Sequence, residues 1–239
     1  MMGDKLRDAW LKVSSLVTRH SSLRYDHVIF DLDGTLVDSL ADLSLAVNHA
    51  LRSLELPALP VDMVAGYIGE GARILVQRAL GDTHQNQFEE ALGLFMAHYS
   101  PHLLDHTRPY PGVAAMLAEL AARRVALSVL SNKPVAMSRA ILDGLELSSY
   151  FVAVLGGDSL PTRKPDRAGV ERLRALTDTP PDRMLLVGDS AIDARTAEAA
   201  GVAFCGATWG FNSAGLVGVA TPARLIADPK ELLAIVEGN

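Results

Sequence analysis

Short apolar runs alternate with amphipathic stretches along most of the chain. Six runs, several of them rich in β-branched residues, end in small or polar residues, which is typical of buried strands. Apolar spacing favours helices between most of these runs, at 113–123, 134–147, 166–177 and 191–200. The alternation predicts an α/β protein with a doubly wound parallel sheet that places its ligands at the carboxyl ends of the strands. The predicted strands are 25–31, 125–132, 151–158, 183–189, 202–209 and 223–228.

The alternation stops between residues 43 and 109. Helical spacing recurs at 43–54, 73–80 and 88–99, and no segment has a convincing strand pattern. We therefore predict an all-helical insertion, and Tyr110-Pro111-Gly112 marks the return to the sheet. The predicted division is an N-terminal extension at 1–24, a catalytic core at 25–42 and 110–239, and a helical cap at 43–109. Residues 1–20 are expected to form an amphipathic helix that packs locally or at an oligomer contact.

Composition narrows the class of protein. The chain has 239 residues, of which 49% are hydrophobic, 5% aromatic and 21% charged, which fits an aliphatic-rich globular protein and excludes a disordered or collagen-like chain. No apolar run approaches the ~20 residues that span a bilayer, and the first residues lack a signal peptide's basic start and apolar stretch. We expect a cytoplasmic protein with no membrane partner.

Charge and cysteine content exclude further classes. The net charge is −6 and no basic block stands out, so nucleic acid is not an expected partner. A small anionic substrate remains possible, because a few cations in a cleft outweigh a weak negative surface field. The single cysteine, Cys205, cannot form an internal disulfide or a thiolate cage, so a bound metal needs oxygen or histidine ligands.

An acid pair follows the first predicted strand, in the segment DLDGTLVDS. Asp31 and Asp33 are two residues apart on an extended segment, so they project to the same side. Two such carboxylates repel each other unless a cation or a shared proton compensates. Gly34 permits a tight turn, and Thr35 helps to order a loop whose backbone N–H groups can cradle an anion. The alternative is an ordinary turn beside a helix N-cap.

Complementary polar groups follow the other predicted strands. Taken singly, each has an ordinary structural explanation: Ser131 and Ser190 could cap helices, and Lys164 could be a solvated loop residue. Asp193 could be an acid on the surface of a helix. Together, at the carboxyl ends of successive strands, they predict one site. They are Ser131, Asn132, Lys133, Lys164, Asp189, Ser190 and Asp193.

With these residues in place, the chain resembles the haloacid dehalogenase superfamily of phosphohydrolases, through DLDGTL, SNK, RKP and GDSAID. The segments YPGV, SNKP, GGDSLP and IGEGARILVQRAL are most similar to the phosphoglycolate phosphatase subgroup. The resemblance extends from Tyr25 to the C-terminal region and implies a Rossmann-like core with a helical cap inserted after the first strand. Two departures are Ser131 for the commoner threonine, which keeps the hydroxyl, and Arg167 where the subgroup usually has a second proline.

Phosphoryl transfer requires a nucleophile, neutralised phosphoryl oxygens and a proton for the leaving oxygen. Asp31 suits the nucleophile, which forms an aspartyl-phosphate. By the resemblance, Asp33 is the general acid and later the base. Asp31, the Asp33 carbonyl and Asp189 form an all-oxygen set that fits Mg²⁺. The expected substrate-binding residues are Gly34, Thr35, Ser131, Asn132 and Lys164, with Ser190 and Asp193 in support.

The helical cap is expected to choose the leaving group. Gly69 to Arg73 precede a helical run, so Arg73 is predicted to bind the carboxylate of a small phosphorylated acid; a solvated helix arginine is the alternative. His98, His102 and His106 recur every four residues, but Pro101 interrupts a helix there, which favours a connection over a metal site.

These features predict a Mg²⁺-dependent phosphomonoester hydrolase, with 2-phosphoglycolate as the leading substrate. The partner is a small phosphorylated metabolite, and the chain is a monomer or homodimer. One alternative is a phosphatase or mutase acting on a sugar phosphate or another small phosphometabolite. The other is a receiver-like phosphorylated binding switch, against which the DGT turn, the chain length and the insertion argue.

Overall fold

The structure is a computed structural model that describes residues 24–216 and 224–238. A six-stranded sheet with every strand pair parallel forms its centre, in the order β5-β4-β1-β6-β7-β8. All six predicted strands and the α/β fold class are confirmed, whereas the helix predicted within 1–20 lies outside the described residues. The strands are β1 (His27–Phe30), β4 (Ala126–Leu130), β5 (Ala153–Leu155), β6 (Met184–Gly188), β7 (Ala203–Ala207) and β8 (Arg224–Ile226).

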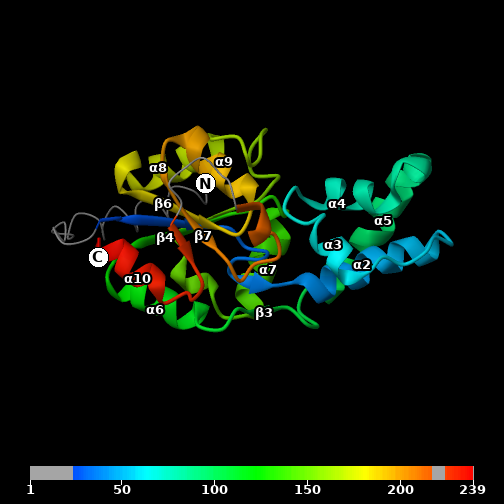
Figure 1. Ribbon diagram of the computed structural model, residues 1–239, viewed down its shortest axis with the longest axis horizontal. Helices are drawn as coiled ribbons and strands as arrows, with labels where there is room; N and C mark the ends of the chain where they lie inside the picture. The colour runs from blue at the N-terminus through cyan, green and yellow to red at the C-terminus, as the bar shows by residue number, and fades with distance from the viewer. Residues whose placement is uncertain (1–23, 217–223, 239) are drawn as a thin grey trace, which may run out of the picture.

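Helices cover both faces of this sheet (Figure 1). In β1, Val28 and Phe30 pack into the apolar layer of α6, α7 and α10, whereas Ile29 packs into the layer of α8 and α9. Because successive strand residues point to opposite faces, a fully apolar strand fits between two helical layers. The helices are α6 (Val113–Ala122), α7 (Val135–Gly144), α8 (Ala168–Thr177), α9 (Ala191–Ala200) and α10 (Glu231–Glu237).

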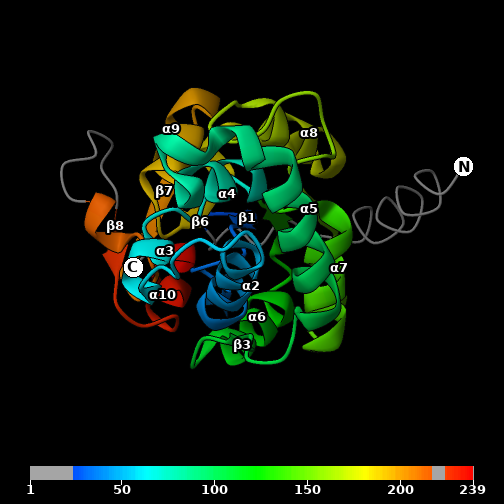
Figure 2. The ribbon, with the colours of Figure 1, turned by 90° about the vertical axis from the view of Figure 1, so that its right-hand side faces the viewer.

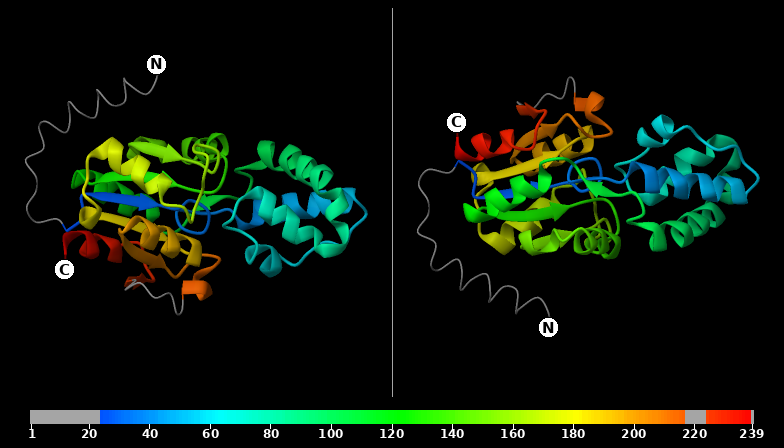
Figure 3. Two further views of the ribbon diagram at one scale, coloured as in Figure 1. Left: turned by 90° about the horizontal axis from the view of Figure 1, so that it is seen from above. Right: turned by 90° about the horizontal axis from the view of Figure 1, so that it is seen from below.

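The helical insertion lies beyond the carboxyl ends of the strands (Figures 2 and 3). Its longest helices, α2 (Leu40–Ser53) and α5 (Phe88–Tyr99), pack against each other, with α4 (Ala72–Leu80) beside them. All three predicted helices are present, although α2 begins three residues early. The sequence did not predict α3 (Val61–Ala65), which is too short to display a helical period. Short 3₁₀ helices occupy Asp82–Gln87, Ser100–His102, Ser148–Tyr150, Pro181–Arg183 and Ser213–Leu216.

Two short strands that the sequence did not predict join the insertion to the sheet. They are β2 (Val37–Asp38) and β3 (Arg108–Pro109), which pair antiparallel. Beside them, buried Asp42 accepts hydrogen bonds from the Thr107 backbone N–H at 2.8 Å and from the Thr107 hydroxyl at 2.7 Å. The chain thus enters and leaves the insertion at one place. The domain boundaries at 42/43 and 109/110 stay a prediction.

No helix in the described ranges is both long enough and apolar enough to cross a bilayer.

His27 makes the core sensitive to acid. Its ring is fully buried, with Nε2 2.9 Å from the Ser128 hydroxyl and Nδ1 3.0 Å from the Thr177 hydroxyl. Burial lowers the pKa of His27 to about 3, from about 6.5 in an unfolded chain. Below pH 6.5 the unfolded chain therefore takes up a proton that the folded protein does not. The stability contributed by neutral His27 is present above pH 6.5 and is lost as the pH falls towards 3.

We expect the free energy of unfolding to fall between pH 6.5 and pH 4.5 by about 2 kcal/mol more in the wild type than in His27→Leu. Urea denaturation at the two pH values measures the change in the free energy of unfolding of each protein, and the two changes are then compared. Equal decreases in the two proteins would contradict a buried neutral histidine.

Candidate active site

The predicted site residues gather at the carboxyl ends of neighbouring strands. Asp31 follows β1, Ser131 follows β4 and Asp189 follows β6, while Lys164 lies in the loop after β5. All four residues are buried. The topology explains the convergence, because parallel strands end at one edge of the sheet.

Lys164 lies between two carboxylates. Its ammonium is 2.8 Å from Asp31 Oδ1 and 2.7 Å from Asp193 Oδ1. Burial alone would lower the pKa of Lys164, because it disfavours the charged ammonium. The carboxylates of Asp193 and Asp31 outweigh this effect and raise the pKa above its ordinary value. The other oxygen of Asp193 accepts from the Ser190 hydroxyl at 2.6 Å, in a capping box at the start of α9. Asp193 is thus engaged on both oxygens and fixes the position of the lysine.

The carboxylates of Asp31, Asp189 and Asp193 form a compact cluster whose potential ligand atoms lie within 4.8 Å of one another. Burial, reinforced by the neighbouring acids, raises the pKa of Asp189 to about 8; burial and Asp193 raise the pKa of Asp31 to about 6 despite Lys164. These raised pKa values reflect carboxyl groups that lack enough positive charge nearby, and a divalent cation would supply that charge. Hard oxygen donors suit Mg²⁺, so the residues present fit the expected ion.

The Asp33 carboxylate points away from this cluster. Its Oδ2 is 2.8 Å from the ammonium of Lys133, and its Oδ1 accepts from the Ser39 hydroxyl at 2.6 Å. Burial disfavours the charge on Lys133, but the Asp33 carboxylate outweighs it and raises the pKa of Lys133. No separate role was predicted for Lys133, although it follows Ser131 and Asn132 at the end of a strand.

Two glycines and an asparagine shape the surroundings of Asp189. A Cβ on Gly34, whose φ is +86°, would lie 2.4 Å from Asp189 Oδ2, and a Cβ on Gly210 would lie 2.2 Å from Asp189 Cβ. Thr35 Oγ1 is 3.4 Å from Asp189 Oδ1, and the Asn212 N–H donates to Oδ2 at 3.2 Å. Gly210 and Asn212 follow β7 and belong to none of the four motifs, so the sequence offered no signal for them.

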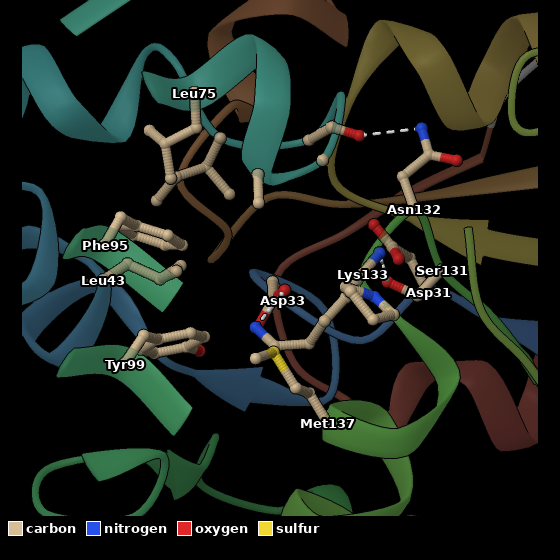
Figure 4. Close-up of a pocket in the computed structure, with 15 residues that line it drawn as sticks. Asp31, Asp33, Leu43, Leu75, Phe95, Tyr99, Ser131, Asn132, Lys133 and Met137 are labelled. Atoms are coloured by element: carbon tan, nitrogen blue, oxygen red, sulfur yellow. Dashed lines mark hydrogen bonds and ion pairs between the residues drawn. The ribbon is translucent and has the colours of Figure 1, made fainter. Parts of the chain in front are cut away.

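The side-chain amide of Asn132 is bonded within the protein, and the substrate-binding role predicted for this residue stays a prediction. Its amide nitrogen donates to the Gly69 carbonyl at 3.0 Å and to the Lys164 carbonyl at 3.1 Å (Figure 4). An amide has two N–H donors, so this side chain has none left for a phosphoryl oxygen. The Ser131 hydroxyl differs, because it accepts from the Lys133 N–H at 3.3 Å and keeps its own hydrogen to donate. Asn132 instead joins the insertion to the core.

A cavity lies between the core and the insertion. Asp31, Asp33 and Ser131 line its core side (Figure 4). Several apolar side chains complete the wall, including Leu43, Ile68, Leu75, Phe95, Tyr99 and Met137.

Arg73 is not among the residues that line the cavity, contrary to the role predicted for it. Its side chain is 56% exposed, pairs with Glu89 Oε1 at 2.8 Å, and its guanidinium carbon lies 4.7 Å from the centroid of the Phe88 ring. The apolar side of α4, with Leu75 and Leu80, is buried, so Arg73 falls on another face of the helix. The arginine therefore contacts solvent and α5.

Three histidines of the insertion lie side by side with their rings tilted. The centroid of His98 is 4.3 Å from that of His49 and 4.8 Å from that of His102. The potential metal cluster found in the described part of the chain contains no histidine.

Comparison with known proteins agrees with this site. The family model for haloacid dehalogenase-like hydrolases matches residues 28–207. The chain belongs to this family. It is 38% identical over 213 residues to a phosphoglycolate phosphatase from Pseudomonas putida, covering 86% of this chain and 78% of the relative. It is 42% identical over 193 residues to one from Rhodospirillum rubrum, covering 77% and 80%.

A solved structure supports the same assignment. The crystal structure of a predicted phosphoglycolate phosphatase from Haemophilus somnus matches with a TM-score of 0.83 and 34% identity, covering 89% of this chain and 98% of the other. The predicted family, the resemblance to phosphoglycolate phosphatases and the enzyme class, a phosphoric monoester hydrolase, are confirmed.

We expect Gly210→Ala to disturb the Asp189 site, because its methyl group would overlap Asp189 and the Gly34 carbonyl, which would lie 2.3 Å away. The free energy of unfolding should fall by about 1–3 kcal/mol, and the Mg²⁺ concentration for half-maximal activity should rise at least about tenfold, as for the loss of a ligand-orienting neighbour.

Gly93→Ala is the matched control, since a Cβ there meets nothing within 4 Å in α5. A Gly210→Ala protein with wild-type Mg²⁺ dependence would show that this contact does not position Asp189.

Proposed function

We propose that this hydrolase is Mg²⁺-dependent, acts through an aspartyl-phosphate on Asp31, and has 2-phosphoglycolate as its main substrate. The observation that carries the proposal is the position of Asp31, which is buried at one end of a small cavity, bonded to Lys164 and beside Asp189. The names of the relatives support the substrate. The cytoplasmic location and the monomeric or homodimeric state stay predictions.

Asp31 is held in a fixed orientation for attack. Its Oδ1 accepts from the Leu32 N–H at 2.7 Å and pairs with Lys164 at 2.8 Å. In the proposed reaction an Asp31 carboxylate oxygen bonds to phosphorus while the bond to the leaving oxygen breaks. Lys164 neutralises charge on the phosphoryl oxygens, and the Ser131 hydroxyl donates to one of them. Mg²⁺, held by Asp31, Asp189 and the Asp33 carbonyl, would neutralise the remaining charge.

Asp33 supplies the proton for the leaving oxygen. It then takes a proton from the water that attacks the aspartyl-phosphate, so one carboxyl group serves both halves of the reaction. Its position between Lys133 and Ser39, in the wall of the cavity, supports this role.

A panel of small phosphate esters tests the activity and the substrate. We expect the highest kcat/KM for 2-phosphoglycolate and near-complete loss of turnover on removal of Mg²⁺ with EDTA or in Asp31→Asn, which lacks the charged nucleophile. A larger kcat/KM for a sugar phosphate would change the substrate assignment. Release of an isomerised ester would indicate a mutase, and stable phosphorylation without turnover would indicate a receiver-like switch.

Asp33→Asn tests the general acid. We expect a smaller loss of kcat with p-nitrophenyl phosphate, whose leaving group needs little protonation, than with 2-phosphoglycolate. Steady-state kinetics with both esters measures the difference. Losses of the same size would assign Asp33 another role.

A further inference from the structure

Lys133 is the only cation among the residues that line the cavity, all of which are described. Its side chain is 5% exposed, and its ammonium is 2.8 Å and 2.9 Å from the two carboxylate oxygens of Asp33. The ammonium also lies 4.8 Å from the centroid of the Tyr99 ring. A lysine ammonium has three N–H donors, so it can hold a second anion or exchange one for another. A buried cation facing a small cavity points to an anionic ligand there.

Tyr99 supplies an independent observation. The residue is 1% exposed, and its hydroxyl finds no hydrogen-bond partner of regular geometry among the described residues. Tyr99 lines the cavity, and Figure 4 shows its hydroxyl at the end of the ring that faces Lys133 and Asp33. The neighbouring Lys133 ammonium can only donate to this hydroxyl, so the hydroxyl keeps its own hydrogen to donate to an anion bound in the cavity.

We propose that Lys133 and Tyr99 together bind the carboxylate on the leaving group of the substrate. The proposal rests on the function proposed above and identifies how this chain selects a phosphorylated carboxylic acid. Lys164 and Ser131 serve the phosphoryl group at the core end of the site, whereas Lys133 and Tyr99 lie towards the insertion. Leu75 and Phe95, which line the cavity on the side of the insertion, have apolar side chains that cannot bind a carboxylate.

The same contact couples recognition to catalysis. In the structure both oxygens of Asp33 lie within 3 Å of the Lys133 ammonium. A substrate carboxylate competes for that ammonium and leaves the Asp33 side chain free to turn towards the leaving oxygen. A phosphate ester without a carboxylate lacks this effect. Esters with and without a carboxylate should therefore differ in kcat as well as in KM.

Tyr99→Phe is the sharpest test, because it removes the hydroxyl and keeps the ring that packs in the cavity wall. The two substrates are 2-phosphoglycolate and 2-hydroxyethyl phosphate, which is similar in size but has no carboxylate. We expect kcat/KM to fall at least tenfold for the first and less than twofold for the second. Tyr150→Phe, the same change at a tyrosine outside the cavity wall, is the control.

Lys133→Met provides the second variant. The kcat/KM should fall for both substrates, because Asp33 loses its partner. The ratio of kcat/KM for 2-phosphoglycolate to that for 2-hydroxyethyl phosphate should also fall at least tenfold. Lys133→Arg keeps the charge and should recover part of that ratio. Lys230→Met removes an exposed lysine as a control. Equal losses for both substrates in Tyr99→Phe and Lys133→Met would overturn the proposal, as would a selective loss confined to Arg73→Ala.

Calorimetric binding of 2-phosphoglycolate separates this proposal from the proposed function. If the wild type binds this ester but hydrolyses neither substrate, the proposed function fails, and at least tenfold weaker binding by Tyr99→Phe still supports the carboxylate site. If the wild type turns over both esters and Tyr99→Phe binds 2-phosphoglycolate as tightly as the wild type does, the proposed function stands and the carboxylate site is overturned.

Discussion

Repulsion among the buried carboxylates of Asp31, Asp189 and Asp193 is the constraint on which the site depends. Lys164 balances part of this charge, and the Ser190 capping box fixes Asp193 so that the lysine has a defined place. Gly34 and Gly210 let two backbone segments approach Asp189 more closely than any side chain would permit. The protein thus concentrates negative charge where a cation is needed and stabilises that arrangement from the surrounding loops.

The insertion supplies the second side of the cavity whose first side is formed by the strand ends. Asn132 and Asn212 donate side-chain hydrogen bonds to the successive carbonyls of Gly69 and Ile68, so the core holds one turn of the insertion over the cavity. Asn212 also donates its backbone N–H to Asp189, which links this closure to the cluster of acids. Apolar side chains from α2, α4 and α5 line the cavity on the side of the insertion.

The core of the site could be predicted because strand ends in a parallel sheet must converge, which brings Asp31, Ser131 and Asp189 together. Side-chain directions in the loops could not, since hydrogen bonds between distant segments decide them: Asp33 turns to Lys133 and Asn132 to Gly69. The prediction for Arg73 was wrong in its geometry for a reason visible in the sequence. The apolar period of α4 already directs Leu75 inward and leaves the arginine to another face.

The single junction formed by β2, β3 and the Asp42–Thr107 hydrogen bonds has an evolutionary consequence. Because the polypeptide departs from the sheet and returns to it at adjacent points, the intervening helices can diverge or be exchanged without altering any strand register. The strand ends that carry the phosphoryl-transfer residues and the helices that cover them are thereby encoded in separate stretches of the gene. New specificities can arise in one stretch while selection preserves the other.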